Sequence, residues 1–142
     1  MLSAAWAHPP PSILIVDDDQ DIREALAEVL ARAGYLVSTA ANGKIALEQA
    51  QENRPDLIVL DLVMPVMCGW TFLEAQRRDP GLASIPVIVA SASIDSQVEG
   101  VAVLLGKPFE LDTLLMIVAR LCGLGRVPLG RSSVIAAPGA DG

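Results

Sequence analysis

The sequence predicts an open, doubly wound α/β fold in which helices cover both faces of a five-stranded parallel sheet. Short apolar runs alternate along the chain with stretches of helical periodicity, an order typical of parallel sheets. The runs are apolar throughout instead of alternating with polar residues, as in strands that are buried on both faces. Hydrophobic residues make up 52% of the chain and charged residues 19%, a composition that supports a core and argues against disorder.

The expected elements follow one another between residues 13 and 122. Strands are expected at residues 13–16, 35–39, 57–60, 86–90 and 101–105. Helices are expected at 22–33, ended by Gly34, then after Asn42 and before Pro55, at 69–78 and at 109–122. Only residues 92–100 separate the fourth and fifth strands, so the fourth helix of the series should be short or irregular.

The two ends of the chain lack this pattern. Residues 1–12 include three consecutive prolines and are expected to form a flexible leader, and the Gly-, Pro- and Ser-rich residues 123–142 a disordered tail. One domain at 13–122 remains. No run approaches the roughly 20 apolar residues of a membrane span, and the leader does not resemble a signal peptide. A cytoplasmic location is therefore expected.

Charge and cysteine usage narrow the classes of partner. The formal net charge is −7 and the isoelectric point about 4.5, so the surface should repel nucleic acid and anionic lipid. We therefore expect neither as a partner. Cys68 and Cys122 are far apart and show no zinc-binding spacing with His8, which favours two reduced thiols.

Polar side chains follow the strands at the edge where parallel α/β sheets bind their ligands. The first strand leads into Asp17, Asp18 and Asp19, the third into Asp61, the fourth into Ser91 and the fifth into Lys107. Crowded carboxylates repel one another, and a hard divalent cation relieves the repulsion; Mg²⁺ fits best. Taken singly, each residue has a simpler explanation, and Asp19 or Asp21 is better explained as a cap of the following helix than as a ligand.

This set of groups suits phosphoryl transfer. Asp61 can act as a nucleophile towards phosphorus, Lys107 and the metal can balance charge on the phosphoryl oxygens, and Ser91 can donate a hydrogen bond to one of them. A glycine-rich phosphate loop is missing after the first strand, which disfavours a nucleotide-binding version of the fold.

Four blocks of sequence resemble the signature motifs of response-regulator receiver domains. They are residues 13–19 with their acidic end, 61–69 (Asp-x-x-Met-Pro-x-Met-x-Gly), 90–92 and 107–109. The resemblance covers about residues 13–121 and implies a flavodoxin-like strand order 2-1-3-4-5. It implies a signalling domain rather than an enzyme, phosphorylated by a sensor histidine kinase or a histidine phosphotransfer protein, and a monomer or weak dimer that acts on another protein.

The resemblance also implies a role for each site residue. Asp61 corresponds to the phosphoacceptor, Ser91 and Lys107 to the groups that contact the phosphoryl oxygens, and Lys107–Pro108 to a candidate cis peptide. The implied Mg²⁺ ligands are the carboxylates of Asp17, Asp18 and Asp61 and the backbone carbonyl of Val63.

Two departures from the motif leave alternatives open. Leu104 stands where receivers often carry an aromatic residue, and the fourth-helix region is short. Both favour a receiver-like module that docks or dimerises without phosphate. A third reading is a Mg²⁺-dependent phosphohydrolase with Asp17 as nucleophile and Asp19 as acid, although about 110 residues leave no room for a substrate-enclosing cap.

Overall fold

In the part of the chain that the structure describes, six parallel strands form a single sheet in the order β2-β1-β3-β4-β5-β6. The computed structural model describes residues 10–62, 64, 67–92, 101–122 and 133–135. The strands are β1 (Ser12–Val16), β2 (Leu36–Ala40), β3 (Leu57–Asp61), β4 (Val87–Ser91), β5 (Val103–Gly106) and β6 (Ser133–Ile135). The first five have the predicted 2-1-3-4-5 order, so the doubly wound, flavodoxin-like prediction is confirmed.

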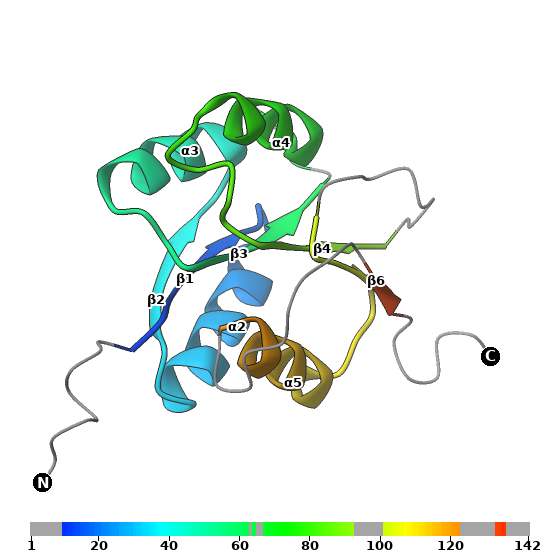
Figure 1. Ribbon diagram of the computed structural model, residues 1–142. Helices are drawn as coiled ribbons and strands as arrows, with labels where there is room; N and C mark the ends of the chain where they lie inside the picture. Colours follow the sequence, from blue (N-terminus) through cyan, green and yellow to red (C-terminus); the bar gives the residue numbers. More distant parts are fainter. Residues whose placement is uncertain (1–9, 63, 65–66, 93–100, 123–132, 136–142) are drawn as a thin grey trace, which may run out of the picture.

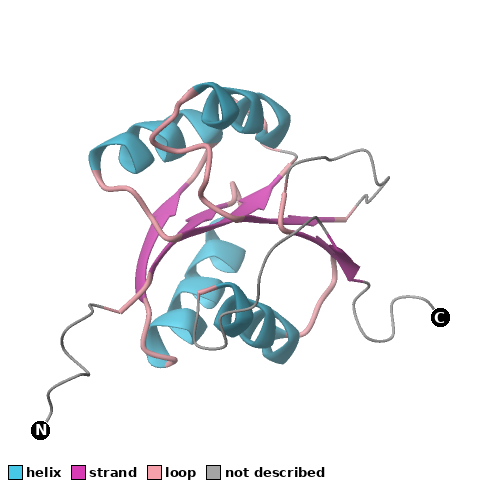
Figure 2. Cartoon of the chain, viewed as in Figure 1, coloured by secondary structure: helices cyan, strands magenta, loops and turns pink. Residues whose placement is uncertain are grey.

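Helices cover both faces of this sheet (Figure 1). Helices α2 (Gln20–Arg32) and α5 (Leu111–Leu121) lie on one face, and α3 (Gly43–Glu52) and α4 (Gly69–Arg78) on the other (Figure 2). The predicted capping residues are confirmed, although the helices expected at 22–33 and 109–122 span Gln20–Arg32 and Leu111–Leu121. The side chains of Asp19 and Asn42 accept backbone N–H bonds at the starts of α2 and α3, and Gly34 follows α2 with a φ of 105°.

The strands divide their side chains between two cores. Because successive side chains point to opposite faces, Leu14 and Val16 of β1 pack against α3 and α4, whereas Ile13 and Ile15 pack with Leu30 of α2. The same alternation continues through β3, β4 and β5. The apolar runs in the sequence are therefore explained by burial on both sides.

The C-terminal segment contains an element that the sequence did not predict. Residues 123–142 were expected to be a disordered tail, but Ser133–Ile135 pairs in parallel with β5, in the register Val103↔Ser133. The outer edge of β5 offers unpaired backbone groups, and so short an extended segment can pair there without any detectable sequence period. The other residues of that segment lie outside those described.

Some strand starts differ from the expected positions, and one expected helix cannot be compared. The fifth strand begins at Val103 instead of 101, and the fourth at Val87 instead of 86. The expected short fourth helix falls on residues 93–100, which lie outside the described part of the chain. In that described part, each helix is too short or too polar to cross a membrane.

Candidate functional site

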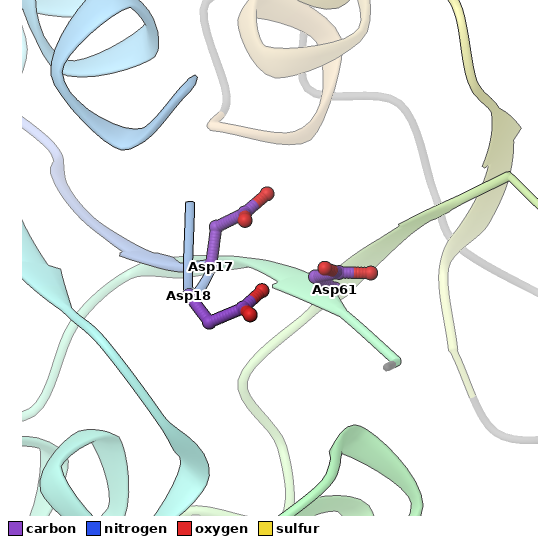
Figure 3. Close-up of side chains that lie close together, drawn as sticks. All are labelled: Asp17, Asp18 and Asp61. Atoms are coloured by element: carbon purple, nitrogen blue, oxygen red, sulfur yellow. The ribbon is translucent and has the colours of Figure 1, made fainter. Parts of the chain in front are cut away.

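Three aspartates meet at the carboxyl-terminal edge of the sheet. Asp17 and Asp18 directly follow β1, and Asp61 is the last residue of the neighbouring β3. Each offers a carboxylate oxygen, and these oxygens lie within 4.8 Å of one another (Figure 3). Asp17 is buried, Asp61 is half-buried and Asp18 is exposed. The predicted cluster of Asp17, Asp18 and Asp61 is therefore brought together by the pairing of β1 with β3.

Lys107 supplies a positive charge to this cluster. Its Nζ lies 3.1 Å from Oδ2 of Asp17 and 3.8 Å from Oδ2 of Asp61, and its side chain is only 19% exposed. The residue follows β5, and its peptide bond to Pro108 is cis, as predicted. Among the described residues, this one ammonium group lies near two of the three clustered carboxylates, so the cluster keeps an excess of negative charge.

Ser91 lies between Asp61 and Lys107 in the strand order. It ends β4 and is buried, and the sheet register pairs Asp61 with Ala90 and Ser91 with Gly106. The backbone N–H of Lys107 donates to the Ser91 carbonyl at 2.9 Å. Consecutive strand ends therefore carry the nucleophile candidate, the hydroxyl and the cation in the predicted order.

The segment after β1 is held by its own hydrogen bonds. The Asp17 N–H donates to the Ala40 carbonyl of β2, and Asp17 Oδ1 accepts the N–H of Asp19 at 2.9 Å. Asp19 Oδ1 in turn accepts the N–H of Ile22 at 3.2 Å. Asp19 therefore caps α2, as expected, and is not a member of the aspartate cluster among the described residues.

Arg23 is a residue of this region that sequence reasoning missed. Its guanidinium Nη1 donates to the backbone carbonyl of Asp17 at 2.8 Å. In the sequence it is one of several charged residues along α2, so nothing there distinguishes it from a solvated surface charge.

Glycine at the start of α4 allows close packing behind Asp61. The Gly69 N–H donates to the Leu62 carbonyl at 2.9 Å. A Cβ at this position would lie 2.7 Å from both the Asp61 carbonyl oxygen and the Leu62 Cα. The glycine of the second motif therefore fits a contact that no other residue could make without displacing backbone.

Three neighbours of the site complete its description. Val63, whose carbonyl was expected to be a ligand, lies outside the described residues. Leu104 is buried in the core on the α3–α4 side of the sheet. Cys68 precedes α4, and hydrogen bonds from the backbone and then the hydroxyl of Thr71 lower the pKa of its thiol.

The donor set fits a hard divalent cation. The three clustered carboxylates present oxygen ligands only, which are the ligands that Mg²⁺ prefers, and their mutual repulsion favours a bound cation. The neighbouring Lys107 offsets only part of their charge. Asp17, Asp18 and Asp61 are therefore the residues that would hold Mg²⁺.

Comparison with known proteins agrees with this site. The family model for the response regulator receiver domain matches residues 13–119. The transcriptional regulatory protein PrrA of Mycobacterium tuberculosis is 40% identical over 115 residues, which cover 78% of this chain and 49% of PrrA. Protein Rrf1 of Nitratidesulfovibrio vulgaris is 34% identical over 113 residues, which cover 78% of this chain and 82% of Rrf1. The chain thus spans about half the length of PrrA.

Solved structures show the same fold. The chemotaxis response regulator CheY4 of Vibrio cholerae matches with a TM-score of 0.73 and 35% identity, covering 79% of this chain and 98% of that one. The response regulator TrrA of Thermotoga maritima, solved in complex with Mg²⁺ and BeF, matches with a TM-score of 0.70 and 30% identity, covering 78% and 98%.

The doubly wound sheet with acidic, hydroxyl and lysine groups at consecutive strand ends defines a receiver domain. This chain belongs to the response regulator receiver family of two-component systems.

Proposed function

We propose that this protein accepts a phosphoryl group on Asp61 from a histidine kinase or a histidine phosphotransfer protein, and signals through contact with another protein. The observation that carries the proposal is the convergence of Asp17, Asp18 and Asp61 within 4.8 Å, with the Lys107 ammonium 3.8 Å from Asp61. Receiver domains are signalling domains. Asp61 is half-buried and lies, in strand order, between the aspartates that follow β1 and Ser91 at the end of β4.

In the proposed transfer, a carboxylate oxygen of Asp61 forms a bond to phosphorus while the phosphorus–nitrogen bond of the donor phosphohistidine breaks. The imidazole leaves with the electron pair and takes a proton from water. Lys107 stabilises charge on the phosphoryl oxygens, and the Ser91 hydroxyl, one strand from Asp61, donates to one of them. Asp17, Asp18 and Asp61 would hold Mg²⁺, which would supply further positive charge for the transfer. The buried Asp17 keeps Lys107 in place through their 3.1 Å ion pair.

An apolar groove beside the site supports the proposal that the phosphoryl donor is a protein. The groove has a volume of about 460 Å³ and lies between Ile22 and Ala25 of α2 and the Pro108–Phe109 segment, with Lys107 at its wall. A partner helix that packs its apolar residues there would place a histidine beside the acidic cluster.

We further propose that the protein acts as a single-domain receiver. The similarity to Rrf1, 82% of whose length is covered, and to the CheY4 structure, 98% of whose chain is covered, supports this arrangement. PrrA, whose name describes a transcriptional regulator, extends well beyond the matching region.

Intact-protein mass spectrometry tests the proposal. After incubation with acetyl phosphate and MgCl₂, the wild type should gain one phosphoryl group, and chelation of Mg²⁺ with EDTA should prevent the gain. Asp61→Asn should gain none. Asp112→Asn, the same substitution in the first turn of α5 and outside the cluster, should behave as the wild type.

An unmodified wild type, or a phosphorylated Asp61→Asn, would contradict the assignment. The first result would favour the phosphate-independent docking module, for which the buried Leu104 in place of an aromatic residue is the supporting observation.

A further inference from the structure

We propose that Arg23 is a positioning residue for the metal site: it holds the peptide group that joins Asp17 to Asp18, and through it the direction of the Asp18 carboxylate. This inference rests on the proposed function, because it assigns Arg23 a role in Mg²⁺ binding by the aspartate cluster.

The contact is made just beyond the end of the pairing between β1 and β3. The backbone pairing of β1 with β3 ends at Val16 and Leu60, so the Asp17 carbonyl lies beyond the last pair of that ladder. Arg23 Nη1 donates to this carbonyl at 2.8 Å from the first turns of α2. A charged donor on a neutral acceptor makes one of the stronger hydrogen bonds available to a protein.

Peptide geometry carries the effect from this carbonyl to Asp18. The peptide bond is planar, so the Asp17 oxygen and the Asp18 N–H and Cα share one rigid plane. Fixing the oxygen therefore fixes the orientation of that plane and the direction in which Asp18 leaves the strand. The Asp17 side chain is independently held by the Asp19 N–H and Lys107, whereas Asp18 is exposed.

Arg23 is itself anchored from the helix side. Its backbone N–H donates to the Asp19 carbonyl at 2.9 Å, and Asp19 caps the same helix through the N–H of Ile22. The side chain thus bridges a capped helix start and the end of β1. This arrangement makes Arg23 part of a rigid support for the cluster instead of a solvated charge.

Electrostatics alone makes the opposite prediction, which allows a decisive test. If Arg23 acted only as a nearby positive charge, its removal would make the site more negative and tighten Mg²⁺ binding. If it positions Asp18, its removal weakens binding despite the added negative charge. Groups that orient metal ligands typically change metal affinity by about tenfold or more.

The experiment is a MgCl₂ titration followed by two-dimensional ¹⁵N NMR of the full chain, for the wild type, Arg23→Gln, Arg23→Lys and Arg32→Gln. Arg23→Gln should bind Mg²⁺ about tenfold more weakly than the wild type, with the largest change in the amide signals of Asp17 and Asp18. Arg23→Lys keeps the charge and one donor and should recover part of the affinity. Arg32 lies at the other end of α2, paired with Glu28 on the surface, so Arg32→Gln is a control with the same loss of charge.

The outcomes separate this inference from the proposed function. A wild type that shows no saturable Mg²⁺ binding would refute the metal site itself. A wild type that binds, together with equal or tighter binding by Arg23→Gln, would refute the positioning role and leave the site intact. If only the lysine variant retains a folded spectrum, wild-type affinity in that variant overturns the inference and weaker affinity supports it.

Discussion

Replacing Asp18 with asparagine should stabilise the protein in the absence of Mg²⁺. Asp18 contributes one of three carboxylate oxygens that lie within 4.8 Å of one another, and the Lys107 ammonium group lies near the other two, those of Asp17 and Asp61. Folding therefore brings like charges together that are far apart in the unfolded chain. An amide at this position keeps the size of the side chain and removes one of the charges.

The magnitude follows from Coulomb's law at 4.8 Å, the upper limit of the distances between the three carboxylate oxygens. Two unit charges 4.8 Å apart repel by about 0.9 kcal/mol in water and by about 3.5 kcal/mol at an effective dielectric constant of about 20. Asp18 is exposed, so the lower figure is the better guide for each of its two neighbours, and the attraction of Lys107 offsets part of the sum. We expect the free energy of unfolding to rise by about 1 kcal/mol.

The assay is urea unfolding followed by far-ultraviolet circular dichroism, in EDTA and in MgCl₂ at matched ionic strength. The wild type should gain about 1.4 kcal/mol when free Mg²⁺ is ten times its dissociation constant, whereas Asp18→Asn should gain much less. Asp21→Asn is the matched control. Asp21 lies in the first turn of α2 outside the cluster, where its charge favours the helix, so its loss should destabilise slightly.

Two results would refute this reasoning. Asp18→Asn could be less stable than the wild type in EDTA, which would mean that Asp18 makes favourable contacts that outweigh the repulsion. Asp18→Asn could also gain as much stability from Mg²⁺ as the wild type, which would place the cation elsewhere.

Three further predictions concern packing, thiol chemistry and the sixth strand. Gly69→Ala should lower the free energy of unfolding by about 1–3 kcal/mol in the same urea assay, because the added Cβ would lie 2.7 Å from a backbone oxygen. Gly81→Ala is the control: its Cβ would meet only a side-chain oxygen at 3.3 Å, so the free energy of unfolding should change little. Near pH 8, Cys68 should react with a disulfide reagent much faster than Cys122. Burial raises the pKa of Cys122 to about 11, so its thiol stays protonated until the pH approaches that value. Equal rates for the one cysteine left in each of Cys68→Ser and Cys122→Ser would contradict this. Val134→Pro should speed backbone amide exchange in β5, since proline disrupts the pairing of β6 with that edge; unchanged exchange would show that β6 does not protect it.

Much of the fold was predictable because short-range patterns carry it. Continuous apolar runs such as residues 57–60 can be buried only between two layers of helices, and Asn42 and Gly34 mark helix ends by their local chemistry. The expected strand order places Asp17, Asp18, Asp61, Ser91 and Lys107 at one edge of the sheet. The residue types at those strand ends then indicated a site for a cation and a phosphoryl group.

Other features depend on contacts between residues that are distant in the sequence or hidden among similar ones. The pairing of β6 with β5 joins residues 133–135 to residues 103–105 through backbone groups, which leave no side-chain pattern to detect. The position of the Lys107 ammonium group near both Asp17 and Asp61 depends on how four neighbouring strands, β1, β3, β4 and β5, are packed side by side. Arg23 resembles every other charged residue of α2 in the sequence, and only the path of the chain after β1 brings the Asp17 carbonyl within its reach. The hydrophobic periodicity of the sequence determines which surfaces are buried and where the strands end. A single hydrogen bond or the pairing of an edge strand depends on the three-dimensional positions of residues that are distant in the sequence.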